Sequence, residues 1–532
     1  MRPMTRRPNL EHLEGRLAPA TLLNPTTLRY TDVDGDAVTV HVSKGALALS
    51  NPGGGPTDDF TLVSAGLGQQ LQLINFSDDN GEFAHANLTI AAKRTTLGGD
   101  GLVNIGFINS TGFDLGAVTV RGDLGRIDAG DANPAAPGLA ALSVRSLGRL
   151  GTSTQVAGGS LISSVQGDLP TLTVATDMDG AAVNASGRIG SAFVGGSILG
   201  GSTTFSGRIQ GAGGINSITV RHDLVASDQD ESGKIFTGGN LGRVFLGGSL
   251  VGGTDGVADF VGQIHAGGHL GPVRILGDVV GNAADRSAQI DAATIDSIFI
   301  GGSLVGGGGS NSARVVSTGN VGAVTILGDI RGGAGNDSGK IVVDGSLAGL
   351  TVGGSLVGGS GSEETDPTRA GQVFAKSIGP VRIGGNLQGA TGGSSARVAS
   401  SNGIARLSVG ASILGADGET SAEVGTAGVI GLIQVRGDVR GGGSSSSGAI
   451  FANSGLGDVR IGGSLVGGGG PNSGTVDTSG SIGRVTIGHD LRGGTAVGNL
   501  SGAVSASHRI AGVTIGGSVY ASTTPGVTSV AV

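Results

Sequence analysis

Residues 241–253 read LGRVFLGGSLVGG, and close copies of this stretch recur along most of the chain. Its second half, GGSLVGG, occurs four times, beginning at Gly247, Gly301, Gly353 and Gly462. Aligning the chain on the Ser of this motif produces a column of Ser, Asp or Asn residues, here called the anchors, at intervals close to 26 residues. The anchors are Asp177, Ser197, Asp223, Ser249, Asp278, Ser303, Asp329, Ser355, Asn386, Ser412, Asp438, Ser464, Asp490 and Ser518. A repeat of about 20–50 residues is typical of solenoids, propellers and other stacked arrays.

Aliphatic residues recur at fixed distances from each anchor. Around Ser249 they are Leu241, Val244, Leu246 and Leu250, and most other repeats carry Val, Leu or Ile at the same places. The residue between Val244 and Leu246 varies, so side chains alternate in and out as in a half-buried strand. Such a short strand cannot bury its apolar face alone, and successive repeats must therefore stack. The sequence predicts an all-β fold, a single-stranded parallel β-helix of about 16 coils of about 26 residues, roughly 75 Å long.

Two other repeat folds fit the sequence less well. A propeller blade needs about 40–45 residues and four strands. The run from Leu241 to Ser249 mimics a leucine-rich repeat, but residues 306–319 (GGGGSNSARVVSTG) lack the helical pattern of the second half of such a repeat. Glycine accounts for 109 of the 532 residues, yet the hydrophobic fraction of 38% is large enough to form a core.

The anchors alternate between Asp and Ser, with Asn386 in place of one Asp. Equivalent residues of stacked coils lie ~4.8 Å apart, and two carboxylates at that distance repel by roughly 3.5 kcal/mol at an effective dielectric of 20. We expect the alternation to relieve this repulsion, and duplication of a two-coil unit explains it equally well. The triplet RGD at 121–123 and 436–438 places an Arg two residues before an anchor-type Asp, which predicts ion pairs within a coil rather than cell-adhesion sites.

The two ends of the chain lack the repeat. We expect residues 1–24 to be a targeting-like segment without fixed structure and residues 25–100 to be a small N-terminal β unit that caps the solenoid. The parallel β-helix then covers residues 101–520, and residues 521–532 form a C-terminal tail. A cap is expected because an open end would expose unpaired strand edges. Within it, strands at 28–31 and 37–42 flank an Asp-Gly turn, which predicts a hairpin.

Residues 10–20 read LEHLEGRLAPA. This run resembles an L-E-x-L-E-x-R-x-x-P-A motif at the N-termini of many large planctomycete proteins thought to be exported or surface-bound. The remainder of the chain resembles the Gly-rich repeat proteins of such bacteria and, more loosely, is similar to autotransporter passenger domains. The resemblance implies a secreted or cell-surface location, although the apolar core of an ordinary secretory signal is missing from this segment.

Composition and motifs exclude several function classes. The formal net charge of −8 argues against a nucleic-acid partner, because such proteins carry a basic footprint. No apolar run approaches the ~18 residues of a membrane-spanning helix. The chain has no Cys, which removes zinc–thiolate sites and Cys nucleophiles, and the P-loop, nucleophile-elbow and HExxH motifs are missing.

One group of residues has the chemistry of a metal site. Asp32, Asp34 and Asp36 in the run DVDGD offer the oxygen density that calcium prefers. They depart from the EF-hand pattern, since Gly35 separates the second and third Asp and no Glu stands at position 12. Calcium is therefore the one candidate cofactor, and a solvated hairpin turn is the alternative.

Two further groups could bind a partner. Phe245, Arg274 and Phe299 occupy the outward position of three consecutive coils, and we expect Arg274 to lie between the two rings in a cation–π stack. This column could form a platform for a sugar or peptide, or a protective ladder on the surface. The acidic insertion at residues 358–372 carries a set of charged side chains that could contact a partner: Glu363, Glu364, Asp366 and Arg369.

A second insertion, at residues 252–262, lies at the same corner four coils away, or ~19 Å along the axis. That separation exceeds the ~6.5–9.5 Å between the carboxyl groups of an inverting glycosidase. The sequence therefore favours a non-catalytic, exported structural or adhesive β-solenoid that presents side loops to a surface glycan or protein. A carbohydrate-active enzyme, a polysaccharide lyase or hydrolase on the same scaffold, is the alternative, and no catalytic residue is assigned.

Overall fold

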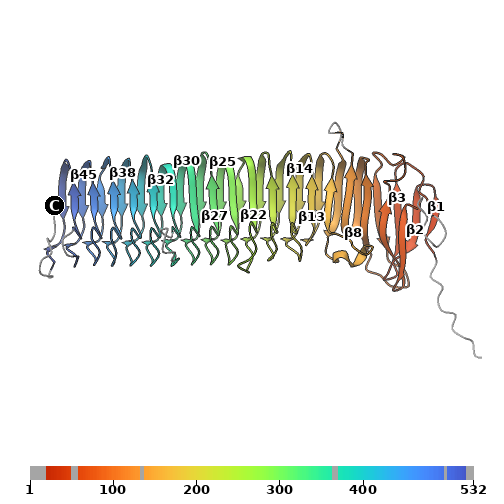
Figure 1. Ribbon diagram of the computed structural model, residues 1–532, viewed down its shortest axis with the longest axis horizontal. Helices are drawn as coiled ribbons and strands as arrows, with labels where there is room; N and C mark the ends of the chain where they lie inside the picture. The colour runs from red at the N-terminus through yellow and green to blue at the C-terminus, as the bar shows by residue number, and fades with distance from the viewer. Residues whose placement is uncertain are drawn as a thin grey trace, which may run out of the picture.

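The structure, a computed structural model, describes residues 19–49, 58–131, 133, 137–361, 369–496 and 500–522. Within these ranges 49 strands join in one continuous sheet, and the only helix is a short 3-10 turn, η1 (Gly151–Thr154). The sheet winds into a parallel β-solenoid of roughly 16 turns of about 26 residues. Figure 1 shows the strands side by side along one straight rod, with β1 to β3 at the N-terminal end. The predicted parallel β-helix is confirmed.

Each coil contributes a strand to each of three parallel ladders. Short strands of the first ladder are β10 (Ile162–Val165), β13 (Ala182–Ala185), β16 (Arg208–Gly211), β19 (Lys234–Thr237), β27 (Arg314–Ser317), β34 (Val398–Ser400), β37 (Val424–Thr426), β40 (Ile450–Ala452), β44 (Val476–Thr478) and β47 (Val504–Ala506). Those of the second are β11 (Leu169–Val174), β14 (Arg188–Val194), β17 (Gly214–Val220), β20 (Leu241–Leu246), β23 (Val273–Ile275), β28 (Val321–Ile326), β35 (Gly403–Val409), β38 (Val429–Val435), β41 (Gly455–Leu456), β42 (Val459–Ile461), β45 (Ser481–Ile487) and β48 (Ile510–Ile515).

Four longer strands pass from the first ladder into the second: β22 (Gln263–Leu270), β25 (Gln289–Ile300), β30 (Lys340–Val352) and β32 (Val373–Ile383). The third ladder consists of two-residue strands just after the anchors: β12 (Met178–Asp179), β15 (Ile198–Leu199), β18 (Leu224–Val225), β21 (Leu250–Val251), β24 (Val279–Val280), β26 (Leu304–Val305), β29 (Ile330–Arg331), β31 (Leu356–Val357), β33 (Leu387–Gln388), β36 (Ile413–Leu414), β39 (Val439–Arg440), β43 (Leu465–Val466), β46 (Leu491–Arg492) and β49 (Val519–Tyr520).

Aliphatic side chains of successive coils stack inside the solenoid. Val244 is in register with Val273, which is in register with Ile298. Their exposed fractions are 0%, 2% and 1%, and they belong to one core cluster that extends from Leu28 to Val504. Because full burial of such a side chain is worth about 1.5–3 kcal/mol, this column is the main source of stability.

The anchors form a continuous hydrogen-bond ladder along the rod. The backbone N–H of Ser249 donates to Asp223 Oδ1 at 2.6 Å, and the N–H of Asp278 donates to Ser249 Oγ at 3.0 Å. The same bond joins each consecutive pair of anchors from Asp177 to Ser518. Asp and Ser are therefore interchangeable here because each supplies an acceptor to the amide of the next coil.

A buried Ser fixes the corner between the third and first ladders. Ser312 is fully buried, and its Oγ accepts a hydrogen bond from Gly307 N at 2.9 Å. The next residue, Ala313, has φ +49°, which turns the chain back into the first ladder. The equivalent bond recurs at Ser206, Ser232, Ser287, Ser338, Ser395, Ser421, Ser447 and Ser473. Both insertions named above interrupt this corner.

The N-terminal cap consists of antiparallel strands that merge into the solenoid: β1 (Thr21–Asn24), β2 (Thr27–Thr31), β3 (Ala37–Val42), β4 (Phe60–Ala65), β5 (Gly68–Asn75) and β6 (Leu88–Lys93). The predicted hairpin of β2 and β3 is confirmed. Strand β1 pairs with β2, although its residues were expected within the unstructured segment, because its backbone completes the edge of the hairpin. Parallel pairing starts where β5 and β6 meet β7 (Val103–Thr111) and β8 (Leu115–Gly130), and β9 (Leu139–Leu147) follows.

The ion pairs predicted within the RGD triplets are wrong. Asp123 instead accepts hydrogen bonds from Ser146 Oγ at 2.7 Å and from the backbone of the following loop. The pairs that do form use an Arg two residues after an anchor, as between Arg331 and Asp329 at 2.6 Å. The reason is geometric. Arg331 lies on the outward side of a third-ladder strand beside the carboxylate, whereas Arg436 lies in the bend before its anchor and Arg121 is an exposed residue within β8.

Candidate functional site

Three carboxyl groups lie together in the cap hairpin. Asp32, Asp34 and Asp36 occupy the turn between β2 and β3, and one oxygen of each lies within 4.8 Å of the others. The turn is tight because Gly35 adopts φ +100° and the N–H of Asp36 donates to Asp32 Oδ1 at 2.8 Å. The structure therefore brings the three sequence-predicted residues into one site.

The loop that follows β6 closes over this turn. Gly101 N donates to Asp36 Oδ2 at 2.5 Å, and Asp100 N donates to Asp34 Oδ2 at 3.1 Å. These bonds satisfy one oxygen of each carboxylate. The other oxygen, Oδ1, is buried on both Asp34 and Asp36 and has no hydrogen-bond partner.

The electrostatics of the cluster are unfavourable as it stands. Asp36 is fully buried, Asp32 is 6% exposed, and within the described part of the chain no Lys, Arg or His forms an ion pair with the three groups. The pKa of Asp32 is raised to about 7, first by burial and then by hydrogen bonding with the Asp34 carboxyl. Two carboxylates 4.8 Å apart repel by roughly 3.5 kcal/mol at an effective dielectric of 20. A proton or a cation must therefore offset part of the charge.

A second acidic group in the cap was missed by the sequence analysis. Asp59 is 1% exposed, and its Oδ2 accepts a hydrogen bond from Ala48 N at 2.6 Å. The pKa of Asp59 is raised to about 7, mainly by burial and in smaller part by the nearby charges of Asp79 and Glu82. Its residues come from separate segments without a shared motif, so only the folded cap reveals the group.

The outward column of the second ladder is partly as predicted. Phe245, Arg274 and Phe299 are in register on consecutive coils. The Arg274 guanidinium lies 4.2 Å from the centre of the Phe299 ring. Of the two expected ring contacts, only this one forms among the described residues, because the exposed Arg274 side chain lies along the surface toward the following coil. The column is a surface stack and not an enclosed platform.

A larger group of cations and rings lies on the first ladder. Arg208 and Lys234 are nearly buried, and both lie over the ring of Phe236, at 4.9 Å and 5.1 Å. Phe236 stacks on His265 with ring centres 4.8 Å apart, and Lys234 donates to Glu231 Oε2 at 2.7 Å. Arg208 and Lys234 each stand fifteen residues before an anchor, so comparing that position across the repeats would have revealed this column of long polar side chains in the sequence. Both cations share one carboxylate, since Arg208 Nη1 also lies 3.7 Å from Glu231 Oε2.

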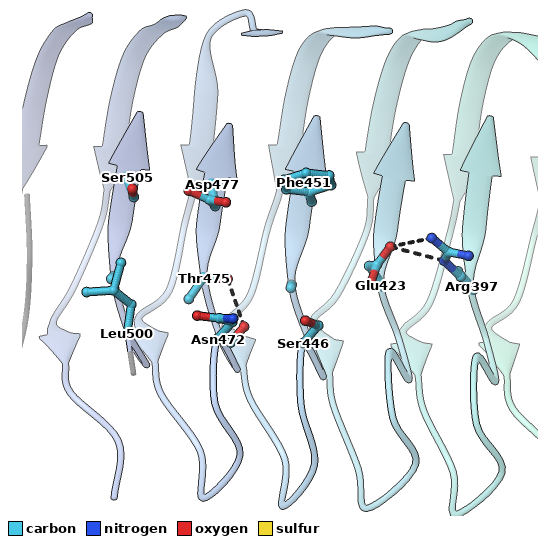
Figure 2. A pocket seen from close by; sticks show the side chains of 11 residues that line it. Arg397, Glu423, Ser446, Phe451, Asn472, Thr475, Asp477, Leu500 and Ser505 are labelled. Carbon is cyan, nitrogen blue, oxygen red and sulfur yellow. Dashed lines mark hydrogen bonds and ion pairs between the residues drawn. The ribbon is translucent and has the colours of Figure 1, made fainter. Parts of the chain in front are cut away.

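A cavity of about 340 Å³ opens on the same ladder near the C-terminal end. Figure 2 shows the side chains that line it on neighbouring strands, among them Glu423, Phe451 and Asp477. The cavity therefore combines the aromatic ring of Phe451 on β40 with two carboxyl groups, that of Asp477 on β44 and that of Glu423 immediately before β37.

One ion pair, between the buried Glu423 and the partly exposed Arg397, shapes the wall of this cavity. Arg397 donates to Glu423 Oε1 from Nε at 3.0 Å and from Nη2 at 2.7 Å (Figure 2). Burial raises the pKa of Glu423, and the charge of Arg397 lowers it in part. The two residues stand 26 positions apart, which is one coil, and they carry opposite charges. This combination is the signal from which the pair could have been predicted in the sequence.

The acidic insertion can be placed only in part. Glu363, Glu364 and Asp366 lie outside the described residues, whereas Arg369 is described and its charge helps burial to lower the pKa of Lys340. In the other insertion, Asp259 forms an ion pair with Arg286 of the next coil at 2.8 Å.

Comparison with models of protein families, with curated proteins and with solved structures finds no match to this chain. Among the described residues there is no helix long and apolar enough to cross a membrane.

Proposed function

We propose that the chain is a non-catalytic structural or adhesive solenoid, secreted or held at the cell surface, which presents side loops to a surface glycan or protein. The observation that carries this proposal is the unbroken anchor ladder together with the continuous aliphatic core. A rod joined by hydrogen bonds and apolar contacts at every coil resists bending and leaves few frayed segments for proteases.

The position of the insertions supports a display role. Each insertion lies in the chain between a third-ladder strand and a first-ladder strand, after β21 and after β31, and these two strands are four coils, or ~19 Å, apart along the axis. Loops on a rigid scaffold are common binding elements. The net charge of −8 favours a partner other than nucleic acid.

Export is supported by the run LEHLEGRLAPA at residues 10–20. The test is fractionation of cells that express the full chain with a C-terminal epitope tag, followed by protease treatment of intact cells. We expect the tag in the envelope or medium fraction and its loss on surface proteolysis. Retention in the cytosolic fraction with full protection would refute export.

The cavity of Figure 2 favours a second candidate, a carbohydrate-active enzyme, because Glu423 has a raised pKa and Asp477 lies two coils further along. General acids of glycosidases are carboxyl groups of raised pKa. The test incubates the full chain with a panel of neutral and acidic polysaccharides and measures new reducing ends.

Cleavage that disappears in Glu423→Gln or Asp477→Asn, but persists in the exposed control Asp344→Asn, would establish the enzyme and overturn the structural proposal. Cleavage lost instead in Glu363→Ala or Asp366→Ala would place the enzyme in the acidic insertion. If the panel is left intact, the structural proposal stands.

A further inference from the structure

We propose that Asp32, Asp34 and Asp36 bind one calcium ion, which fastens the first hairpin of the cap to the loop that leads into the solenoid. This inference concerns the stability of the cap and holds whether or not the chain is exported.

An acidic turn alone would not carry this conclusion. The deciding observation is Asp36, which is fully buried and whose Oδ1 has no hydrogen-bond partner. Buried carboxylate oxygens are almost always satisfied by a donor or a metal ion. Asp34 Oδ1 is unpartnered as well, and both side chains belong to the three-carboxylate group.

The donor set and its dimensions suit calcium. The site offers only oxygen ligands, which hard divalent cations take. Ligands at 2.3–2.6 Å from Ca²⁺ can lie up to about 5 Å apart, whereas those of Mg²⁺, at 2.0–2.1 Å, lie no more than about 4.2 Å apart. The three oxygens in this turn all lie within 4.8 Å of one another and so fit inside the coordination sphere of calcium, and the half-buried Asp34 leaves a side where water can complete the coordination shell.

The surrounding hydrogen bonds explain what the ion would do. Gly101 and Asp100 donate backbone bonds to Asp36 and Asp34, and Thr95 Oγ1 donates to Gly35 O at 2.6 Å. The loop that makes these bonds ends where β7 begins, and β7 is the first strand paired in parallel along its whole length. By neutralising the carboxylates, a calcium ion stabilises the turn to which this loop is hydrogen-bonded. The ion thereby holds the cap hairpin against the first coil, at the N-terminal end of the solenoid.

Terbium provides a site-specific probe because it replaces calcium and its luminescence is excited through a nearby tyrosine. Tyr30 is buried on β2, two residues before Asp32, and the other tyrosine, Tyr520, belongs to the last strand, β49. The chain has no Trp, so tyrosine excitation reports on this site. The full-length protein is stripped with EDTA, titrated with Tb³⁺, and then titrated with Ca²⁺ or Mg²⁺.

We expect saturable Tb³⁺ luminescence that Ca²⁺ displaces at concentrations at least about tenfold lower than Mg²⁺. We also expect the thermal midpoint to rise with Ca²⁺ concentration, since a ligand of the native state stabilises it by mass action. Asp36→Asn and Asp34→Asn should weaken Ca²⁺ binding about tenfold or more, and Asp344→Asn, an exposed carboxylate far along the rod, should leave it unchanged.

The proposal is overturned if the wild-type protein gives no tyrosine-sensitised luminescence and melts at the same temperature in EDTA and in Ca²⁺. It is also overturned if both site variants bind Ca²⁺ as the wild type does, or if Mg²⁺ displaces Tb³⁺ as well as Ca²⁺ does. Should Asp36→Asn fail to fold, the half-buried Asp34→Asn supplies the same readout, and the wild-type titrations decide independently of either variant.

Discussion

The anchor ladder can be tested at a single coil. Asp278 Oδ1 accepts the backbone N–H of Ser303 at 2.6 Å, and Asp278→Ala removes this acceptor while leaving the backbone bond from Asp278 N to Ser249 in place. The natural control is Asp278→Asn, because Asn386 occupies the equivalent position and accepts the N–H of Ser412 at 2.9 Å.

The expected magnitude follows from the lost bond. A hydrogen bond to a charged acceptor contributes about 1.5–3 kcal/mol, and because Ser303 is only partly buried, water offsets part of the loss of this bond. We therefore expect Asp278→Ala to lower the local opening free energy at Ser303 by about 2 kcal/mol, which is roughly a thirtyfold faster amide exchange. Asp278→Asn keeps an acceptor and relieves repulsion from Asp223 and Asp329, so its change should stay within about 1 kcal/mol.

The assay is hydrogen–deuterium exchange with mass spectrometry on peptides that contain Ser303, with peptides near Ser464 as an internal reference. Local exchange is preferable to global unfolding here, since repeat proteins can open one region at a time. If Asp278→Asn exchanges as fast as Asp278→Ala, the charge and not the acceptor matters. If neither variant differs from the wild type, the ladder contributes nothing to stability and our account of the anchors is wrong.

Three further predictions concern the core, the cap and the cavity. Ile300→Ala removes a fully buried side chain and should cost about 2–5 kcal/mol in urea unfolding followed by circular dichroism; an unchanged midpoint would contradict the stacked core. The pKa of Asp59 is raised from 3.8 to about 7, so the folded state binds the proton of this carboxyl more tightly than the unfolded state does. The stability that Asp59 contributes is therefore greatest at low pH and is lost as the pH rises from about 4 to about 7. Asp59→Asn should therefore flatten the pH dependence of the thermal midpoint between about pH 4 and 7 relative to the wild type; parallel curves would refute this. Arg397→Gln leaves the 5% exposed Glu423 unpaired and should destabilise the fold by about 1–3 kcal/mol, whereas adding Glu423→Gln should restore part of the loss; strict additivity would mean that the two charges do not interact.

Much of the solenoid could be predicted because its decisive interactions repeat. Val244, Val273 and Ile298 occupy the same place in successive units, so one rule about strand alternation placed the whole core. The hairpin of β2 and β3 was equally accessible, since an Asp-Gly turn between alternating strands is a local signal. The RGD ion pairs failed because the direction in which Arg436 leaves the bend depends on backbone geometry and not on spacing.

The candidate sites divide in the same way. Asp32, Asp34 and Asp36 are neighbours in the chain, so sequence alone grouped them, but their burial and the unpartnered oxygens depend on the loop that follows β6. The pairing of Arg397 with Glu423 required knowing which face of the first ladder each coil presents.

The amino-acid sequence by itself determined the coil, its length, its stacking and the position of its aliphatic face, because a period of 26 residues leaves a short strand no other way to bury that face. Only the tertiary structure decided which polar atoms meet across coils and which remain without a partner. The physical reason is that hydrophobic burial is non-directional and follows the pattern of residues, whereas hydrogen bonds and ion pairs depend on distances of a few tenths of an ångström between atoms far apart in the chain.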